Sequence, residues 1–444
     1  MLLEKLPPYN LEAEQAVLGS MMLDKEAVYI AMEMLEPEDF YKEAHQLIFS
    51  AILSLEAAGQ PIDMITLTEE LHRQNNIDKI GGVGYIAEVA NIVPTAANIR
   101  HYAEIVVQKT ILRKLIRVST NIANRCYEDQ EDTYELLDDA EKLILEIAEN
   151  RNFSGLIPIK QVLGSTLEKI EYLAGNKGNI TGVPSCFIDL DNMTSGWQAS
   201  DLIILAARPA MGKTSFGLNI AQNAAIRGKI PVAIFSLEMS KEQLVQRLMS
   251  SEAMIDQHKL RTGRLLDEEW VRLTRAAQPL STADIYIDDT PAISVLELRA
   301  KARRLKAEKG LGLIIIDYLQ LMRVGRREEN RQQEISEISR SLKALARELN
   351  VPVIALSQLS RAVEQTQDKR PALSHLRESG ALEQDADLVM FIYREDYYNP
   401  ESEKPGIAEI IIAKHRNGPT GTVELGFIKE FTKFVNIDKH HNPE

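Results

Sequence analysis

The sequence has only two cysteines, Cys126 and Cys186, among 444 residues. They lie far apart, and neither has histidine or cysteine companions at the spacing of a metal site. This scarcity excludes a disulfide scaffold and a zinc ribbon. Long apolar runs are also missing, since runs such as 311–316 are far shorter than the roughly 20 residues of a membrane span. With no apolar leader in residues 1–8, we expect a cytosolic (cytoplasmic) protein with no membrane partner.

Basic side chains are outnumbered by acidic ones, 51 against 65, and the net charge of the chain is −14. The acidity is confined to residues 1–150, where 12 lysines and arginines stand against 27 aspartates and glutamates. Residues 151–444 hold 39 basic and 38 acidic side chains and are almost neutral. A polyanion is repelled by the first part and tolerated by the second, which indicates two parts with different partners.

The first 150 residues have the apolar periodicity of helices, and we expect an all-α domain there. Asn10 is a candidate N-cap for a first helix that ends at Met22. His45 has no partner at a recognisable spacing, so we expect a packing or surface role and no titratable constellation in this domain. Further helices are expected at 41–58, 64–74, 98–127 and 133–149, the last two as an antiparallel hairpin.

Residues 151–180 have the composition of a linker around one amphipathic helix, 159–173. A single helix cannot bury its apolar face alone, so this helix must dock on its own chain or on a neighbour.

From residue 181 to 444, short β-branched runs alternate with helices, which indicates an α/β domain. Continuous apolar runs are typical of a parallel sheet covered by helices on both faces. We expect such strands at 202–206, 232–236, 285–288, 313–317, 351–356 and 388–393, followed by antiparallel strands at 407–414, 421–428 and 434–437.

A phosphate-binding loop follows the first expected strand. Residues 207–214 read Ala-Arg-Pro-Ala-Met-Gly-Lys-Thr, with alanine where the first glycine is usual. Amides around the glycine and at the helix start can hold phosphates, the lysine adds charge, and the threonine hydroxyl can bind Mg²⁺. An incidental turn is the weaker interpretation, because the motif stands between a strand and a helix. The predicted nucleotide-binding residues are Arg208, Pro209, Ala210, Met211, Gly212, Lys213, Thr214 and Ser215.

Three other expected strands end close to polar side chains. Asp317 ends an apolar run and can hold Mg²⁺ beside the phosphate loop, or it can cap a helix. Glu238 follows another strand and is the best candidate to orient or deprotonate water, unless it only initiates a helix. Gln358 could sense the γ-phosphate or simply end its strand.

Five motifs occur in order at residues 206–214, 235–240, 316–320, 357–361 and 414–419. With the opening stretch 6–19, they resemble DnaB-type replicative DNA helicases, bacterial or bacteriophage-encoded, over nearly the whole chain. The resemblance implies a RecA-like P-loop ATPase domain in a homohexameric ring with single-stranded DNA in the channel. It also implies ATP hydrolysis at subunit interfaces, 5′-to-3′ translocation and duplex unwinding at the replication fork.

The resemblance implies roles for individual residues. Lys213 and Thr214 bind phosphate and metal, Glu238 is the catalytic base, and Asp317 is the second carboxylate. Gln358 is the γ-phosphate sensor, and Arg416 with Lys414 acts as an arginine finger on the neighbouring subunit's nucleotide. Without the resemblance, a solvated hairpin charge would be the default interpretation of the finger residue.

Residues 377–387 match the channel loop of the same family, so DNA contacts are expected from Arg377, Glu378 and Gly380. The basic helix 299–309 is more simply a solvated face, and the basic loop 323–331 is the better channel candidate by position.

The acidic domain is expected to hold protein partners. Primase and a helicase loader are implied by the resemblance. Two alternatives remain from the residues alone: a RecA-like recombinase or signalling ATPase, and a DNA-binding scaffold whose ATP site controls only assembly.

Overall fold

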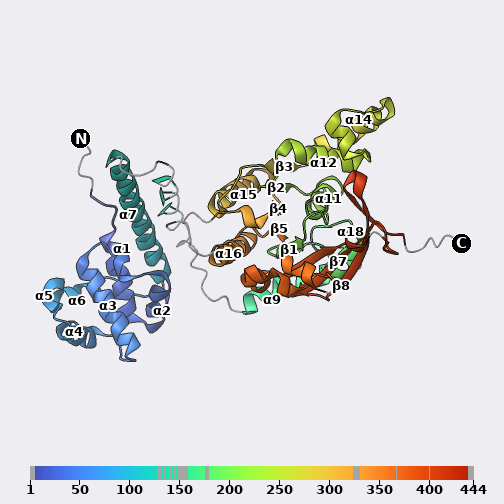
Figure 1. The fold of residues 1–444 in the computed structure, drawn as a ribbon. Coiled ribbons are helices and arrows are strands. Elements are labelled where there is room, and N and C mark those ends of the chain that lie inside the picture. Colours follow the sequence, from blue (N-terminus) through green and yellow to red (C-terminus); the bar gives the residue numbers. More distant parts are fainter. Residues whose placement is uncertain are drawn as a thin grey trace. The chain divides into compact units, whose positions relative to one another are not determined.

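The computed structural model divides the chain into two compact units, Met1–Leu167 and Glu168–Glu444, each of which is considered by itself (Figure 1). The boundary falls inside α9 (Ile159–Gly175), which confirms the helix expected in the linker. No helix in the described part of the chain is long and apolar enough to cross a membrane. The structure describes residues 6–128, 159–175, 180–323, 331–366, 368–399 and 401–438, with scattered residues between 133 and 147.

The N-terminal unit is helical, as predicted. Buried apolar side chains from its first seven α-helices form one core. Of the expected helical hairpin, the first helix is confirmed, and most of 133–149 lies outside the described residues. The elements are α1 (Leu11–Leu23), α2 (Lys25–Met34), η1 (Pro37–Asp39), α3 (Glu43–Ala57), α4 (Met64–Arg73), α5 (Ile77–Ile80), α6 (Val83–Ala90) and α7 (Ile99–Glu128).

Capping side chains set two helix starts in this unit. The Asn10 side chain accepts a hydrogen bond from the Ala13 amide at 3.0 Å and begins α1, as expected. Helix α3 begins two residues later than predicted, because the carboxylate of Glu14 accepts the amides of Tyr41 (2.8 Å) and Lys42 (3.4 Å). A buried acid bound to amides at a helix start is favourable for the helix dipole as well.

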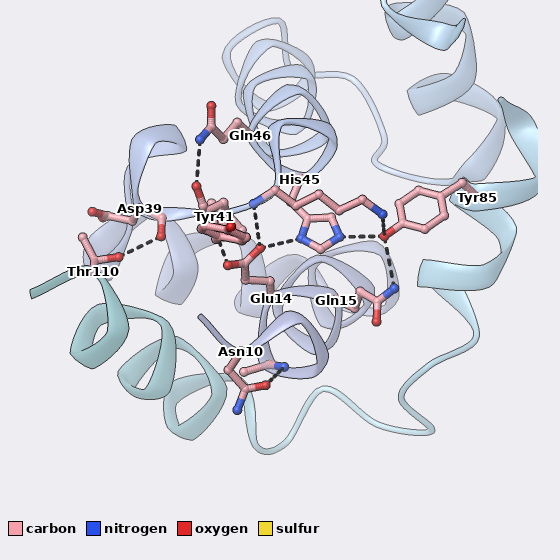
Figure 2. Close-up of polar contacts among 12 residues, drawn as sticks. Asn10, Glu14, Gln15, Asp39, Tyr41, His45, Gln46, Tyr85 and Thr110 are labelled. Carbon is pink, nitrogen blue, oxygen red and sulfur yellow. Dashed lines mark hydrogen bonds and ion pairs between the residues drawn. The ribbon is translucent and has the colours of Figure 1, made fainter. Parts of the chain in front are cut away.

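The expectation that this unit holds no titratable constellation was wrong at His45. The imidazole is fully buried, with Nδ1 2.6 Å from Glu14 and Nε2 2.7 Å from the Tyr85 hydroxyl (Figure 2). That hydroxyl also accepts from Lys42 Nζ (2.8 Å) and Gln15 Nε2 (3.1 Å). Three different helices supply the partners, so no local spacing in the sequence could reveal them. We call this set of five side chains the Glu14 network.

The C-terminal unit is built on a nine-stranded sheet in the order β3-β2-β4-β5-β1-β6-β7-β8-β9. The first six strands are parallel and the last three antiparallel, as predicted. The strands are β1 (Leu202–Ala207), β2 (Val232–Ser236), β3 (Ile285–Asp288), β4 (Leu313–Asp317), β5 (Val353–Gln358), β6 (Leu388–Tyr393), β7 (Ile407–His415), β8 (Gly421–Ile428) and β9 (Lys433–Asn436).

Helices cover both faces of this sheet. Along β1, Ile203 and Leu205 pack on the face that carries α11 (Lys213–Ile226) and α12 (Lys241–Ala253). Leu202 and Ile204 pack on the other face, which carries α15 (Val295–Lys309) and α16 (Arg331–Leu349). Successive side chains of a strand point to opposite faces, and helices cover both faces here, so every residue of the strand must be apolar. The remaining elements are α10 (Ile188–Thr194), α13 (Gln257–Thr262), α14 (Asp267–Thr282), η2 (Leu319–Leu321), η3 (Arg361–Gln365), η4 (Leu373–Ser379), α17 (Gly380–Asp385), α18 (Glu395–Tyr398) and η5 (Lys429–Phe431).

Strand β5 differs most from its predicted range of 351–356. It begins at Val353 because Pro352 has no amide hydrogen for the ladder, and the Val351 amide bonds back to the Ala346 carbonyl. The strand also ends two residues later than predicted, at Gln358, which pairs with the last residue of β1.

Candidate nucleotide-binding site

The predicted phosphate loop connects β1 to α11 at the carboxyl edge of the parallel strands. Gly212 has φ +96°, a left-handed conformation in which a side chain is strained. A Cβ at this position would also lie 3.1 Å from the Phe434 ring. The loop can therefore turn its amides toward a ligand only with glycine here, and α11 presents its N-terminus just beyond.

Lys213, Thr214 and Asp317 meet directly in the structure, although 103 residues separate the last two. The Thr214 hydroxyl donates to Asp317 Oδ2 at 2.7 Å, and Lys213 Nζ lies 3.5 Å from Oδ1. The same ammonium sits 4.2 Å above the centre of the Tyr318 ring. Burial lowers the pKa of Lys213, while Asp317 and Glu238 act in the opposite direction.

The carboxylate of Asp317 is suited to serve as one ligand of a Mg²⁺ ion. It is almost fully buried, and its Oδ1 atom has no hydrogen-bond partner. Carboxylate and hydroxyl oxygens are the hard ligands that Mg²⁺ takes, and the ion usually keeps waters and phosphate oxygens as well. The described residues contain no cluster of three histidine, cysteine or acidic side chains that could hold a metal.

Glu238 lies beside this cluster. The paired strands β2 and β4 align Ser236 with Asp317, and the Leu237 amide donates to the Asp317 carbonyl at 2.7 Å. Glu238 is the next residue and is exposed, as a group that handles water requires.

Arg247 on α12 was missed by the sequence analysis. Burial lowers its pKa, whereas Asp317 and Glu238 raise it, and its buried Nε has no hydrogen-bond partner. It is nine residues from Glu238 on an otherwise ordinary helix, so only the fold brings it toward the site.

Gln358 ends β5 at the same edge, paired with Ala207 of β1. Its side chain is exposed, while its backbone is held on both sides by Gln320. The Gln320 amide donates to the Gln358 carbonyl and accepts from the Gln358 amide, both at 3.2 Å. These two hydrogen bonds fix the backbone of Gln358 at the end of β5, so its exposed side chain is well placed to contact a ligand there.

The other loop residues take different positions. The guanidinium of Arg208 is bound to Glu364 (3.0 and 2.8 Å) and to the Leu359 carbonyl (2.9 Å), so it braces the loop against η3. Met211 and Ser215 are buried beneath the loop, and Ala210 shares the left-handed conformation with φ +65°.

Arg416 and Lys414 lie at the opposite edge of the sheet. Strand β7 is antiparallel to β6, and its last residue, His415, is level with Leu388 at the start of β6. The start of β6 is level with the start of β1, whereas the phosphate loop follows the end of β1. A strand of six residues spans about 17 Å, so Arg416 is separated from the phosphate loop of its own chain by about the length of β1.

Comparison with known proteins assigns the family. The DnaB-like helicase C terminal domain matches residues 182–436, and the DnaB-like helicase N terminal domain matches residues 6–108. The chain belongs to the DnaB-like replicative helicases. Members of this family are ATP-dependent DNA helicases that act in replication, so the RecA-like fold and the enzyme class expected from the sequence are confirmed.

Two relatives match along almost their whole length. The chain is 57% identical over 437 residues to the replicative DNA helicase DnaB of Geobacillus stearothermophilus, covering 98% of this chain and 96% of the relative. It is 56% identical over 440 residues to the replicative DNA helicase DnaC of Bacillus subtilis, covering 99% and 97%. A solved DnaB-like replicative helicase, described with its interactions with primase, matches with a TM-score of 0.77 and 39% identity, covering 97% of this chain and all of that one.

The DNA contacts expected in this DnaB-like helicase fall on η4 and α17. The backbones of Arg377 and Glu378 lie in η4, and Gly380 opens α17; the side chains of the first two are outside the described part of the structure. The loop residues 324–330 are likewise outside it.

The basic helix α15 has the structure of a solvated face, as expected. Arg299 and Arg303 both bind Glu348, and Lys301 binds Asp288 at 2.7 Å. These cations are already paired within the chain, which leaves α15 a poor candidate for DNA.

Proposed function

We propose that this DnaB-like helicase works as a homohexameric ring that hydrolyses ATP between subunits and moves 5′ to 3′ along single-stranded DNA. One observation supports the proposal: Lys213, Thr214 and Asp317 contact one another at one edge of the sheet, where they are suited to hold phosphate and metal, while Arg416 lies at the other edge. A cation so placed can reach a nucleotide only in a neighbouring subunit.

The chemistry follows from the side chains at the carboxyl edge. The backbone N–H groups of Arg208 and of residues 210–212, together with the ammonium of Lys213, hold the β- and γ-phosphates of ATP. Glu238 orients the attacking water and accepts its proton. Gln358 hydrogen-bonds the γ-phosphate and senses its loss. Thr214 and Asp317 would hold Mg²⁺, which supplies positive charge to offset that of the phosphates.

Arg416 and Lys414 complete the site from the adjacent subunit. A planar guanidinium suits the charge that spreads over the transferring phosphoryl group, and such fingers are worth about 10³-fold or more in turnover. Each subunit thus supplies the phosphate loop for one interface and the finger for the next.

Apolar surface also supports the ring. On α9, Leu163, Leu167 and Ile170 are each more than half exposed. On α14, Trp270 and Val271 are 53% and 52% exposed. The α9 helix of one subunit would cover this surface on the C-terminal unit of its neighbour, which we call the motor unit, and this contact removes both apolar faces from water.

Single-stranded DNA would run along η4 and the start of α17, gripped through Arg377 and backbone amides from Glu378 to Gly380. The acidic N-terminal unit is left free for protein partners. A solved relative is described with primase, which supports primase as one partner, and a helicase loader is the other.

Subunit mixing tests the proposal. Lys213→Ala should abolish ATP hydrolysis and unwinding without unfolding the protein, and Arg416→Ala should be inactive alone. Mixed rings should recover turnover, because some interfaces then combine an intact loop with an intact finger. Absence of recovery, when exchange of subunits is demonstrated independently, would contradict action between subunits.

A further inference from the structure

The two finger cations are held against the end of α17. Arg416 Nη2 donates to the Gln384 carbonyl at 2.6 Å. Lys414 Nζ donates to the same carbonyl at 3.2 Å and to that of Glu383. Carbonyls in the last turn of a helix have no partner within the helix and carry its negative dipole, so they are natural sites for cations.

Asp387 provides a second anchor for the finger. The Arg416 amide donates to the Asp387 carbonyl at 2.9 Å, and the guanidinium Nη1 lies 3.7 Å from Asp387 Oδ1. The other carboxylate oxygen accepts the Leu202 amide at 2.8 Å and contacts Lys343. Asp387 is only 6% exposed and is therefore fixed before any ligand binds.

These contacts restrict a side chain that would otherwise be mobile. A free arginine side chain has about 2 kcal/mol of rotamer entropy to lose when it engages a phosphate. Two anchors remove part of this loss in advance, and they use only two of the five guanidinium N–H groups. The remaining donors stay available for the nucleotide of the adjacent subunit.

We propose that Asp387 is a positioning residue for the arginine finger. The inference rests on the proposed role of Arg416 and adds that its carboxylate, fixed by Lys343 and Leu202, sets the direction of the guanidinium. The Asp387 side chain is buried and engaged by Leu202, Lys343 and Arg416, so we expect it to act on hydrolysis through Arg416.

Asp387→Asn in the full-length ring is the first test. The amide still accepts from Leu202, but the charge that orients the guanidinium is gone. We expect kcat for ATP hydrolysis to fall about tenfold, with KM for ATP within twofold of the parent, because nucleotide is bound by the other subunit's loop. Glu409→Gln is the matched control: an equally buried carboxylate, on β7 and paired with Arg370, with activity expected within twofold of the parent.

Mixing then assigns the defect to one side of the interface. Added in excess, Lys213→Ala subunits, which carry intact fingers, should restore most of the turnover per Asp387→Asn subunit, whereas Arg416→Ala subunits should restore none. A structural defect would show no such selectivity. If Lys213→Ala rescues Arg416→Ala but not Asp387→Asn, the positioning role is overturned. If neither is rescued, action between subunits fails, and this inference fails with it.

A second variant covers the case in which Asp387→Asn folds poorly, since it leaves the Lys343 ammonium near a neutral amide. The double variant Asp387→Asn with Lys343→Met removes both charges and keeps the acceptor for Leu202. We expect parental thermal stability together with the same tenfold loss in kcat. Full activity in this folded variant would contradict the proposal.

Discussion

The two units each bury a carboxylate, and they treat it differently. In the N-terminal unit, Glu14 accepts two backbone amides and contacts His45, so both of its oxygens are bound. In the motor unit, Asp317 Oδ1 takes no hydrogen bond, although the Lys213 ammonium is 3.5 Å away. A buried acid whose oxygens are all bound stabilises a fold, whereas one that keeps an oxygen available is suited to a ligand.

Charge divides the units in the same way. The acid-rich part carries −15 over residues 1–150, and the remainder is close to neutral. Nucleotide and DNA are polyanions, and only the second part places cations and loop amides where they could meet one. This division agrees with the proposal that the nucleotide chemistry belongs to the motor unit and that the N-terminal unit serves protein partners.

The largest expected effect that separates the units is on catalysis. Glu238→Gln should keep ATP binding but lower hydrolysis by about 100-fold or more, because the amide has the same shape and accepts no proton. Binding is measured by titration with a fluorescent ATP analogue and turnover by phosphate release. Glu242→Gln, an exposed acid on the following helix, is the control. If Glu238→Gln bound no nucleotide, its role would be structural and the base would lie elsewhere.

A change in the Glu14 network should lower stability and leave hydrolysis unchanged, the reverse of the effect of Glu238→Gln. Tyr85→Phe removes the hydroxyl that Lys42, Gln15 and His45 share, which should lower the free energy of unfolding of the N-terminal unit by about 1–3 kcal/mol. Hydrolysis below the melting transition should stay within twofold. Calorimetry of the full chain checks the first outcome, with Tyr29→Phe, whose hydroxyl contact to Glu56 is exposed, as the control. Unchanged stability would show that the network is dispensable.

The smallest effect depends on pH. Burial raises the pKa of Asp201 to about 6, and Asp387 adds to the rise, while Lys343, His415 and Arg416 oppose it. The folded unit therefore favours the protonated acid. Below the unfolded pKa of about 3.9, Asp201 is protonated in both the folded and the unfolded protein. As the pH rises from there to about 6, the unfolded protein loses this proton more readily, so the free energy of unfolding falls.

Asp201→Asn mimics the neutral acid at every pH. The variant should be about 1 kcal/mol more stable than the parent at pH 8, after allowance for solvent screening, and equal to it near pH 4. Urea midpoints at the two pH values measure this difference, with the exposed Asp284→Asn as the control. Equal stability at pH 8 would mean that Asp201 is ionised without cost.

Continuous apolar runs made much of the sheet readable from sequence. The ranges of β2, β4 and β6 match the predictions residue for residue, because a strand buried on both faces has an unbroken run of apolar residues. The contact of Thr214 with Asp317 also follows from sequence, since parallel strands bring their carboxyl ends to one edge.

What the sequence could not show are contacts made by ordinary residues from distant elements. Nothing local marks His45 as a partner of Glu14 and Tyr85, because these residues lie on three helices. In the sequence, Asp387 is an ordinary acid that precedes a strand. Only the pairing of β7 with β6 brings Arg416 to its carboxylate. These contacts depend on tertiary packing, which neither the hydrophobic periodicity nor the local motifs of a sequence reveal.

The division of labour is tested most directly by separating the units. Each has its own apolar core, so residues 1–150 and 180–444 can be expressed apart and titrated with labelled single-stranded DNA at increasing salt. We predict that only the motor fragment binds, and that its affinity falls as salt rises and phosphate contacts are screened. Salt-sensitive binding by the acidic fragment, with none by the motor fragment, would contradict the account.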